Sequence, residues 1–118
     1  MIAERISNEI EEGLTIPKPN AKQPFKVKGW GIRRGETALI YYIPSHTNPS
    51  KPYEKGVTIT EFEQAYQQLI NEGRFERKWF NENMIACSKE GGCNFTTIGG
   101  IFELLGIAIY GYGKYTKN

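Results

Sequence analysis

The residues that could carry acid–base or metal chemistry in this chain are few and scattered. His46 is the single histidine, and the two cysteines, Cys87 and Cys93, are separated by five residues. With His46 they offer at most three soft metal ligands, at a spacing that matches no standard zinc signature. Glu61 and Glu63 are two apart on an expected helix, so their carboxylates do not face each other. We therefore expect no catalytic residue, no metal, no cofactor and no enzyme activity.

Basic side chains interleaved with aromatic ones form the second group that could bind a partner. Residues 14–55 carry eight basic and two acidic side chains, a local charge of +6, whereas the whole chain carries +2. Cations beside aromatic rings suit the phosphates and bases of a nucleic acid. The alternative is that the rings are core residues and the lysines keep an edge strand soluble. The residues expected to contact nucleic acid are Lys26, Lys28, Arg33, Arg34, Thr96, Thr97 and Lys114.

The elements that must position these residues begin with a short helix, a connector and a hairpin. Isoleucines four apart predict a helix over 3–12, and three prolines make 15–24 an extended connector. β-forming residues on both sides of Arg33-Arg34-Gly35-Glu36 predict a hairpin over 25–43 with an exposed turn, and Gly29 and Gly31 predict a bulge or tight bend at Trp30 between them. Its nearly all-apolar second strand is expected to be central. Residues 44–57 are expected to form an irregular loop.

Three helices and a β-ribbon are expected after residue 57. Thr58 with Glu61, and equally Thr60 with Glu63, match a capping box at the start of a helix over 58–72. A second helix is expected over 75–84, then a linker over 85–93, a third helix over 94–105 and a ribbon over 107–115. Asn94 or Thr96 is expected to cap the third helix, which carries adjacent glycines, Gly99 and Gly100. Such a pair indicates close approach by another surface, either a neighbouring helix or a ligand.

The order of three helices followed by a ribbon resembles that of a winged helix-turn-helix domain. The resemblance covers residues 58–118 and implies that the helix over 94–105 enters the DNA major groove, with 109–115 as the wing. Two features depart from it. The polar side of that helix has no Arg, Lys or Gln to read base edges, and Glu103 would repel phosphates. A helical packing unit without a DNA role is therefore the alternative.

The sequence as a whole predicts an α+β protein with one small domain over 1–118. Its parts are a helix and connector (1–24), a basic hairpin and loop (25–57), and three helices with a ribbon (58–118). No apolar run is long enough to span a membrane and no secretory signal is present, so a cytoplasmic location without a membrane partner is expected. The expected function is nucleic-acid binding; the alternative is a protein-interaction or assembly module, including a homo-oligomer. The expected core is Trp30, Leu39, Ile40, Tyr42, Phe62, Tyr66, Leu69, Trp79, Phe80, Ile98, Phe102 and Leu105.

Overall fold

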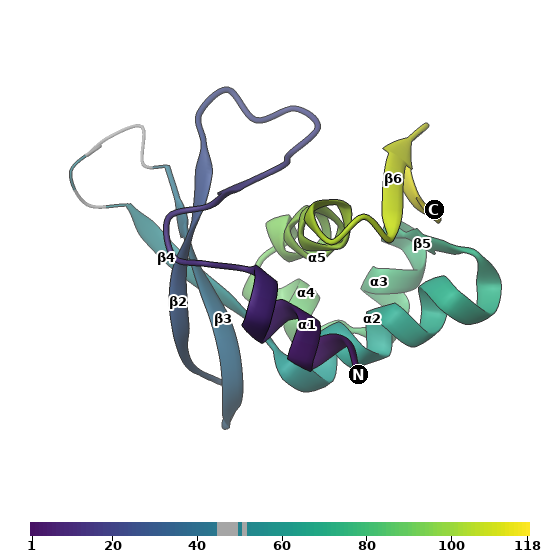
Figure 1. The fold of residues 1–118 in the computed structure, drawn as a ribbon, viewed down its shortest axis with the longest axis horizontal. Coiled ribbons are helices and arrows are strands. Elements are labelled where there is room, and N and C mark those ends of the chain that lie inside the picture. Colours follow the sequence, from purple (N-terminus) through teal and green to yellow (C-terminus); the bar gives the residue numbers. More distant parts are fainter. Residues whose placement is uncertain (45–49, 51) are drawn as a thin grey trace.

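Two antiparallel sheets lie on either side of one buried helix, α5 (Cys93–Leu104), in the computed structural model (Figure 1). The structure describes residues 1–44, 50 and 52–118, and within them the chain is a compact α+β domain, as expected. Among these residues the helices are too short or too polar to cross a bilayer. The other elements are α1 (Ile2–Glu9), β1 (Thr15–Ile16), β2 (Phe25–Arg33), β3 (Glu36–Ile43), β4 (Tyr53–Thr58), α2 (Ile59–Glu72), β5 (Arg74–Glu76), α3 (Arg77–Asn83), α4 (Ile85–Glu90), β6 (Ala108–Gly111) and β7 (Lys114–Lys117).

The first sheet has the strand order β1-β2-β3-β4, so the expected central position of β3 is confirmed. Arg34 and Gly35 both have positive φ, 50° and 75°, which is the two-residue turn that fits the twist of a hairpin. The pairing of β2 with β3 shifts between Val27 and Gly29, so the strand has a bulge, but it lies before Trp30 and not at the expected position. The expectation of an irregular loop over 44–57 is wrong at its end, because β4 pairs with β3. His46 lies outside the described residues.

The helical half begins at a capping box and contains two elements that were not expected. Thr58 Oγ1 accepts from the Glu61 amide at 3.1 Å, and Glu61 Oε1 accepts from the Thr58 amide at 2.9 Å, so the helix starts there. Phe75 lies in strand β5 rather than in a helix, and α4 occupies most of the expected linker over 85–93. The terminal ribbon does not join the first sheet. It pairs with β5 instead, in the order β5-β7-β6.

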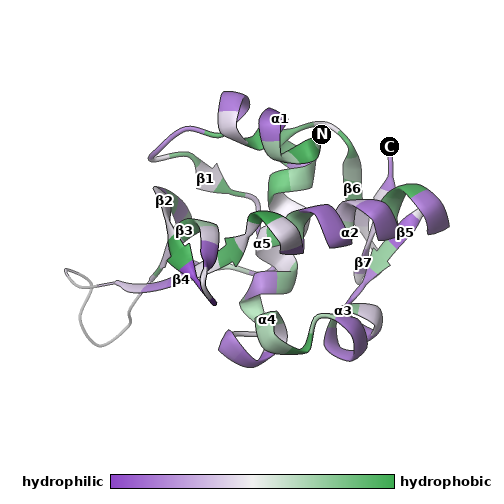
Figure 2. Ribbon diagram, turned by 90° about the horizontal axis from the view of Figure 1, so that it is seen from below, coloured by the Kyte–Doolittle hydropathy of each residue, from purple (hydrophilic) through white to green (hydrophobic). Residues whose placement is uncertain are grey.

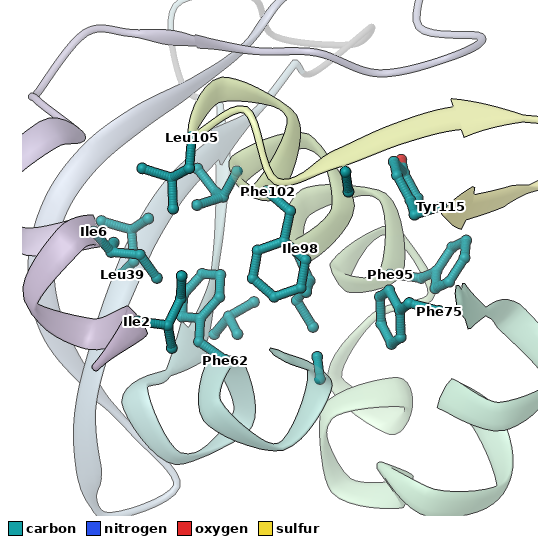
Figure 3. Packing of buried hydrophobic residues seen from close by; sticks show 14 of the residues in the cluster. Ile2, Ile6, Leu39, Phe62, Phe75, Phe95, Ile98, Phe102, Leu105 and Tyr115 are labelled. Atoms are coloured by element: carbon teal, nitrogen blue, oxygen red, sulfur yellow. The ribbon is translucent and has the colours of Figure 1, made fainter. Parts of the chain in front are cut away.

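The core lies around α5, and its aromatic side chains come from the whole helical half (Figure 3). Phe75 packs against Phe95 with ring centroids 4.9 Å apart, and Phe95 packs edge-on against Tyr115 at 5.4 Å. Most of the expected core residues are buried. Trp30, however, is 41% exposed, and Tyr42, Tyr66 and Trp79 are only half-buried.

The adjacent glycines of α5 are places of close approach, as expected, but by two different surfaces of the protein itself. A Cβ built on Gly99 would lie 2.1 Å from Cζ of Tyr115, and one built on Gly100 would lie 2.5 Å from the carbonyl oxygen of Pro17. The first neighbour belongs to the second sheet and the second to the connector. The lack of a side chain at Gly99 therefore lets the second sheet pack closely on α5, and its lack at Gly100 lets the connector do so on the other side.

Candidate nucleic-acid interface

The two arginines of the β2–β3 turn lie against carboxylates. Arg34 Nε and Nη2 donate to the two oxygens of Glu61 at 2.8 and 2.7 Å, and Arg34 Nη1 donates to Glu90 Oε1 at 2.9 Å. Arg33 Nε donates to Glu90 Oε2 at 3.1 Å. The Arg34 side chain is only 22% exposed. The expectation of a free cationic tip is therefore wrong, because both side chains tie the hairpin to α2 and α4. Their binding to phosphate stays a prediction that requires these ion pairs to open.

Glu90, the last residue of α4, joins these contacts into a network. Its carboxylate also accepts from Asn94 Nδ2 at 3.1 Å and from the Gly56 amide at 3.4 Å. Burial by itself would raise the pKa of Glu90, but the hydrogen bonds from Arg34, Asn94 and Gly56 outweigh it and hold the pKa below its ordinary value. One carboxylate thus links the hairpin, the β4 edge and the start of α5.

The other basic residues of the expected site lie on two separate parts of the surface. Lys26 is exposed on β2, and Lys28 forms an ion pair with Glu54 at 2.9 Å. Lys114 is half-buried on β7, where Glu76 of β5 is its cross-strand neighbour. The structure does not bring these lysines together into one patch with the arginine turn.

Thr96 and Thr97 are held by a half-buried lysine that sequence reasoning did not single out. Lys18 Nζ donates to Thr96 Oγ1 at 2.8 Å, to Thr97 Oγ1 at 2.7 Å and to the Cys93 carbonyl at 2.8 Å. The same ammonium lies 4.5 Å from the centre of the Phe25 ring. Desolvation by burial lowers the pKa of Lys18 from 10.5 to about 7. Nothing in the connector sequence distinguishes Lys18 from the exposed Lys22.

The polar side chains at the start of α5 also point inward. Asn94 is fully buried; its Oδ1 accepts from Tyr41 Oη at 2.5 Å and its Nδ2 donates to the Cys87 carbonyl at 3.0 Å. Thr97 is likewise fully buried. Neither Asn94 nor Thr96 caps the helix, so that expectation is wrong. Burial raises the pKa of Tyr41, which keeps the phenol protonated as a donor. In this structure α5 cannot enter a DNA groove, because the side expected to read bases is packed against the connector and β3.

A hollow of about 490 Å³ opens beside the covered start of α5, between the connector and the β6–β7 ribbon. Lys18 and Arg77 line it, and its described lining includes no carboxylate. Arg77 lies 4.7 Å from the centre of the Phe95 ring and donates to the Gly92 carbonyl at 3.0 Å. The remaining lining residues are Pro19, Asn20, Ala21, Phe25, Cys93, Phe95, Thr96, Tyr110 and Gly113. The hollow therefore offers the Arg77 guanidinium and aromatic rings to a negatively charged ligand, whereas the three N–H donors of Lys18 are already bound to protein oxygens.

The turn of the β6–β7 ribbon carries a fully exposed aromatic ring. Tyr112 is fully exposed and has a φ of 52°, and Gly113 follows it with a φ of 78°. A tight turn of this kind presents the side chain away from the sheet. Sequence reasoning placed this residue in the expected ribbon but assigned no role to it, although an aromatic residue between two glycines has few neighbours to pack against.

Comparison of the chain with models of protein families, with curated proteins and with solved structures gave no match. The site must therefore be interpreted from its own geometry. Within the described residues, no group of three or more His, Cys, Asp or Glu side chains is placed to hold a metal ion. Cys87 is buried and Cys93 half-buried, and both are free thiols.

The free energy of unfolding is expected to rise with pH between roughly 7 and 8.5, below the range in which most Cys and Tyr side chains ionise. Folded Lys18 loses its proton near pH 7, whereas the unfolded lysine keeps it until about 10.5. The unfolded state then binds more protons, so stability increases by at most about 1.4 kcal/mol per pH unit. Urea denaturation across this range would measure the slope. Lys18→Met should flatten it and Lys22→Met should not; equal slopes for wild type and Lys18→Met would contradict the assignment.

Proposed function

We propose that the protein binds nucleic acid through the connector and the wing, with helix α5 as their support rather than as the reading element. The observation that carries this proposal is the hollow lined by Arg77, Phe25 and Phe95, whose described lining includes no carboxylate. It lies between the exposed Lys22 of the connector and the ribbon that bears Tyr112. Lys26, at the far end of the connector, adds a further exposed cation. The element order from α2 to β7, which resembles a winged helix with β6–β7 as its wing, supports the same proposal.

Electrostatic attraction would supply most of the affinity, and sequence preference would be weak. Phosphate contacts position a nucleic acid without reading its sequence, and reading requires side chains on base edges. Thr96 and Thr97 are bound to Lys18 and cannot supply them. The expected site thus keeps Lys26 and Lys114 as phosphate contacts, while Thr96 and Thr97 act through the lysine that they hold.

Single strands are the preferred form of the ligand in this proposal. Duplex DNA offers its bases only at their edges, whereas the bases of a single strand can stack on an exposed ring. Tyr112 is fully exposed, and its position on the wing places a stacking ring on the same ribbon as the phosphate-binding Lys114.

Fluorescence anisotropy with random single-stranded and duplex oligonucleotides tests the proposal at about 50 and 200 mM salt. Lys22→Ala with Lys114→Ala should weaken binding to every sequence and flatten the salt slope by about 0.7 per lost phosphate contact. Tyr112→Ala should weaken single-strand binding by about tenfold and leave duplex binding nearly unchanged. Lys89→Ala, which removes an exposed lysine from α4, is the matched control. Absence of binding to both forms at low salt would overturn the proposal.

A further inference from the structure

The outer edge of β2 is covered over only part of its length. β1 pairs with Phe25 and Lys26, and the chain just before β1 pairs with Val27, whose N–H and C=O bond Leu14 and Gly13 at 2.9 and 2.8 Å. Beyond Val27, no strand of the described residues pairs with this edge. The remainder of β2 extends past β1 as one arm of the long hairpin (Figure 1).

The backbone groups on this open edge belong to Trp30 and Ile32. Arg33 and Glu36 flank a two-residue turn and so form a hydrogen-bonded pair within the hairpin. Along a β-strand the backbone N–H and C=O groups of successive residues point to alternate sides. Those of Gly31 therefore also bond β3, whereas those of Trp30 and Ile32 point to the open edge. The Ile32 carbonyl shows this direction, since it accepts from Arg33 Nη1 at 2.9 Å instead of from β3.

The side chains of the same two residues are exposed and apolar. Trp30 is 41% and Ile32 63% exposed, and both lie on the sheet face that carries the buried Leu39 of the neighbouring strand. Protein edges are commonly guarded against pairing by inward-pointing charges, prolines or very short strands. Between Gly29 and Ile32 this edge has none of these, so it can accept another extended strand.

We propose that a second copy of the chain pairs with this edge, antiparallel and symmetric about Gly31, to give a homodimer with one continuous sheet. In that register Trp30 of each copy lies opposite Ile32 of the other, which pairs an aromatic with a β-branched side chain. The outward N–H and C=O groups of Trp30 in one copy can then bond those of Ile32 in the other copy. Gly31 meets its own copy at the non-hydrogen-bonded position, where Cα atoms come closest, about 4.5 Å.

Charge complementarity favours a second copy over an unrelated strand. The same register places Arg33 of one copy opposite Gly29 of the other. A Cβ built on Gly29 would lie 3.2 Å from Glu12 Oε1, so a carboxylate stands at that position. Glu12 is exposed and has no ion pair within the described part of the chain, and Arg33 Nη1 bonds only the exposed Ile32 carbonyl. Two Glu12–Arg33 pairs would therefore form across a two-fold axis, the usual symmetry of a homodimer.

Sedimentation equilibrium of the whole chain tests the dimer over roughly 10 µM to 1 mM, the range expected for a small interface. The apparent mass should rise from 13.4 kDa toward twice that value. Ile32→Lys should keep the protein monomeric throughout. Ile109→Lys, at an equally isolated isoleucine of 53% exposure on β6, should leave association unchanged. A wild-type protein that stays monomeric, or a dimer that survives Ile32→Lys, would overturn the proposal.

Two further variants test the register. Ile32→Pro removes only an outward N–H, which an edge position tolerates, so the monomer should keep its circular dichroism and lose association. In a Cys93→Ser background, Trp30→Cys with Ile32→Cys should give a disulfide-linked dimer on mild oxidation, whereas either cysteine alone should not. Cross-linking by a single cysteine would refute this register. The dimer does not depend on nucleic-acid binding, because the variants expected to abolish it, at Trp30 and Ile32, lie outside the connector and the β6–β7 ribbon.

Discussion

Gly99→Ala is expected to destabilise the protein by at least about 2 kcal/mol, although Gly→Ala in an ordinary helix interior stabilises by about 1 kcal/mol. The added methyl group would lie 2.1 Å from a ring carbon of Tyr115, far inside van der Waals contact. That ring is fully buried beneath Phe95 and Phe75, so it cannot turn away (Figure 3). Because the interior is closely packed, the added methyl group can be accommodated only if the second sheet moves away from α5.

A double-mutant cycle separates this clash from the helix propensity. In a Tyr115→Ala background, Gly99→Ala should become neutral or stabilising, since the ring that it meets is gone. Gly111→Ala is the control, because a Cβ built on Gly111 meets nothing within 4 Å. Urea denaturation measures each variant. If Gly99→Ala had the same effect with and without the tyrosine ring, the close approach would not be what requires the glycine.

Glu90→Gln is expected to lower the free energy of unfolding by about 2–3 kcal/mol at neutral pH. The amide keeps the shape of the side chain but directs N–H donors at groups that themselves donate. Arg34 retains Glu61, whereas Arg33 loses its only carboxylate among the described residues. The Glu90 side chain is 21% exposed, so solvent screens these contacts less than it would screen a surface pair.

The pH dependence of stability gives this prediction a second readout. Because the pKa of Glu90 is lower in the folded protein, its contribution is present above the ordinary carboxyl pKa of 4.5 and is lost as the pH falls below it. The difference in stability between wild type and Glu90→Gln should therefore shrink on acidification. Glu54→Gln, which removes the exposed partner of Lys28, should cost less than about 1 kcal/mol. A constant difference down to pH 3 would rule out the proposed role of the charge.

Local signals in the sequence were enough to place the elements that carry them. The capping box at Thr58 and Glu61 locates the start of α2, and Arg34-Gly35 locates the hairpin turn, because each depends on residues adjacent in the chain. The elements β4, β5 and α4 were missed. They are short, and β4 and β5 exist only because they pair with strands distant in sequence, β3 and β7.

The candidate site was less predictable because its residues are positioned by contacts across the fold. A turn at the end of a hairpin is normally open to solvent, but here Arg34 meets a carboxylate 56 positions away. Lys18 meets Thr96 and Thr97 at separations of 78 and 79. Neither spacing follows a helical or strand period. The apolar pattern of α5 indicated burial of one face, while its polar residues gave no sign that the opposite face is covered too.

The double covering of α5 has a consequence for how the chain can be divided. The segment after residue 57 looks like a separable module in sequence, yet its helix α5 lies between the two sheets (Figure 2). Removing the first 57 residues would strip Ile16 and Pro17 from Gly100 and leave Asn94 and Thr97 without Tyr41 and Lys18. We therefore expect the two sheets to unfold as one cooperative unit, so that neither half stays folded without the other and the terminal ribbon cannot be exchanged by recombination at an internal boundary.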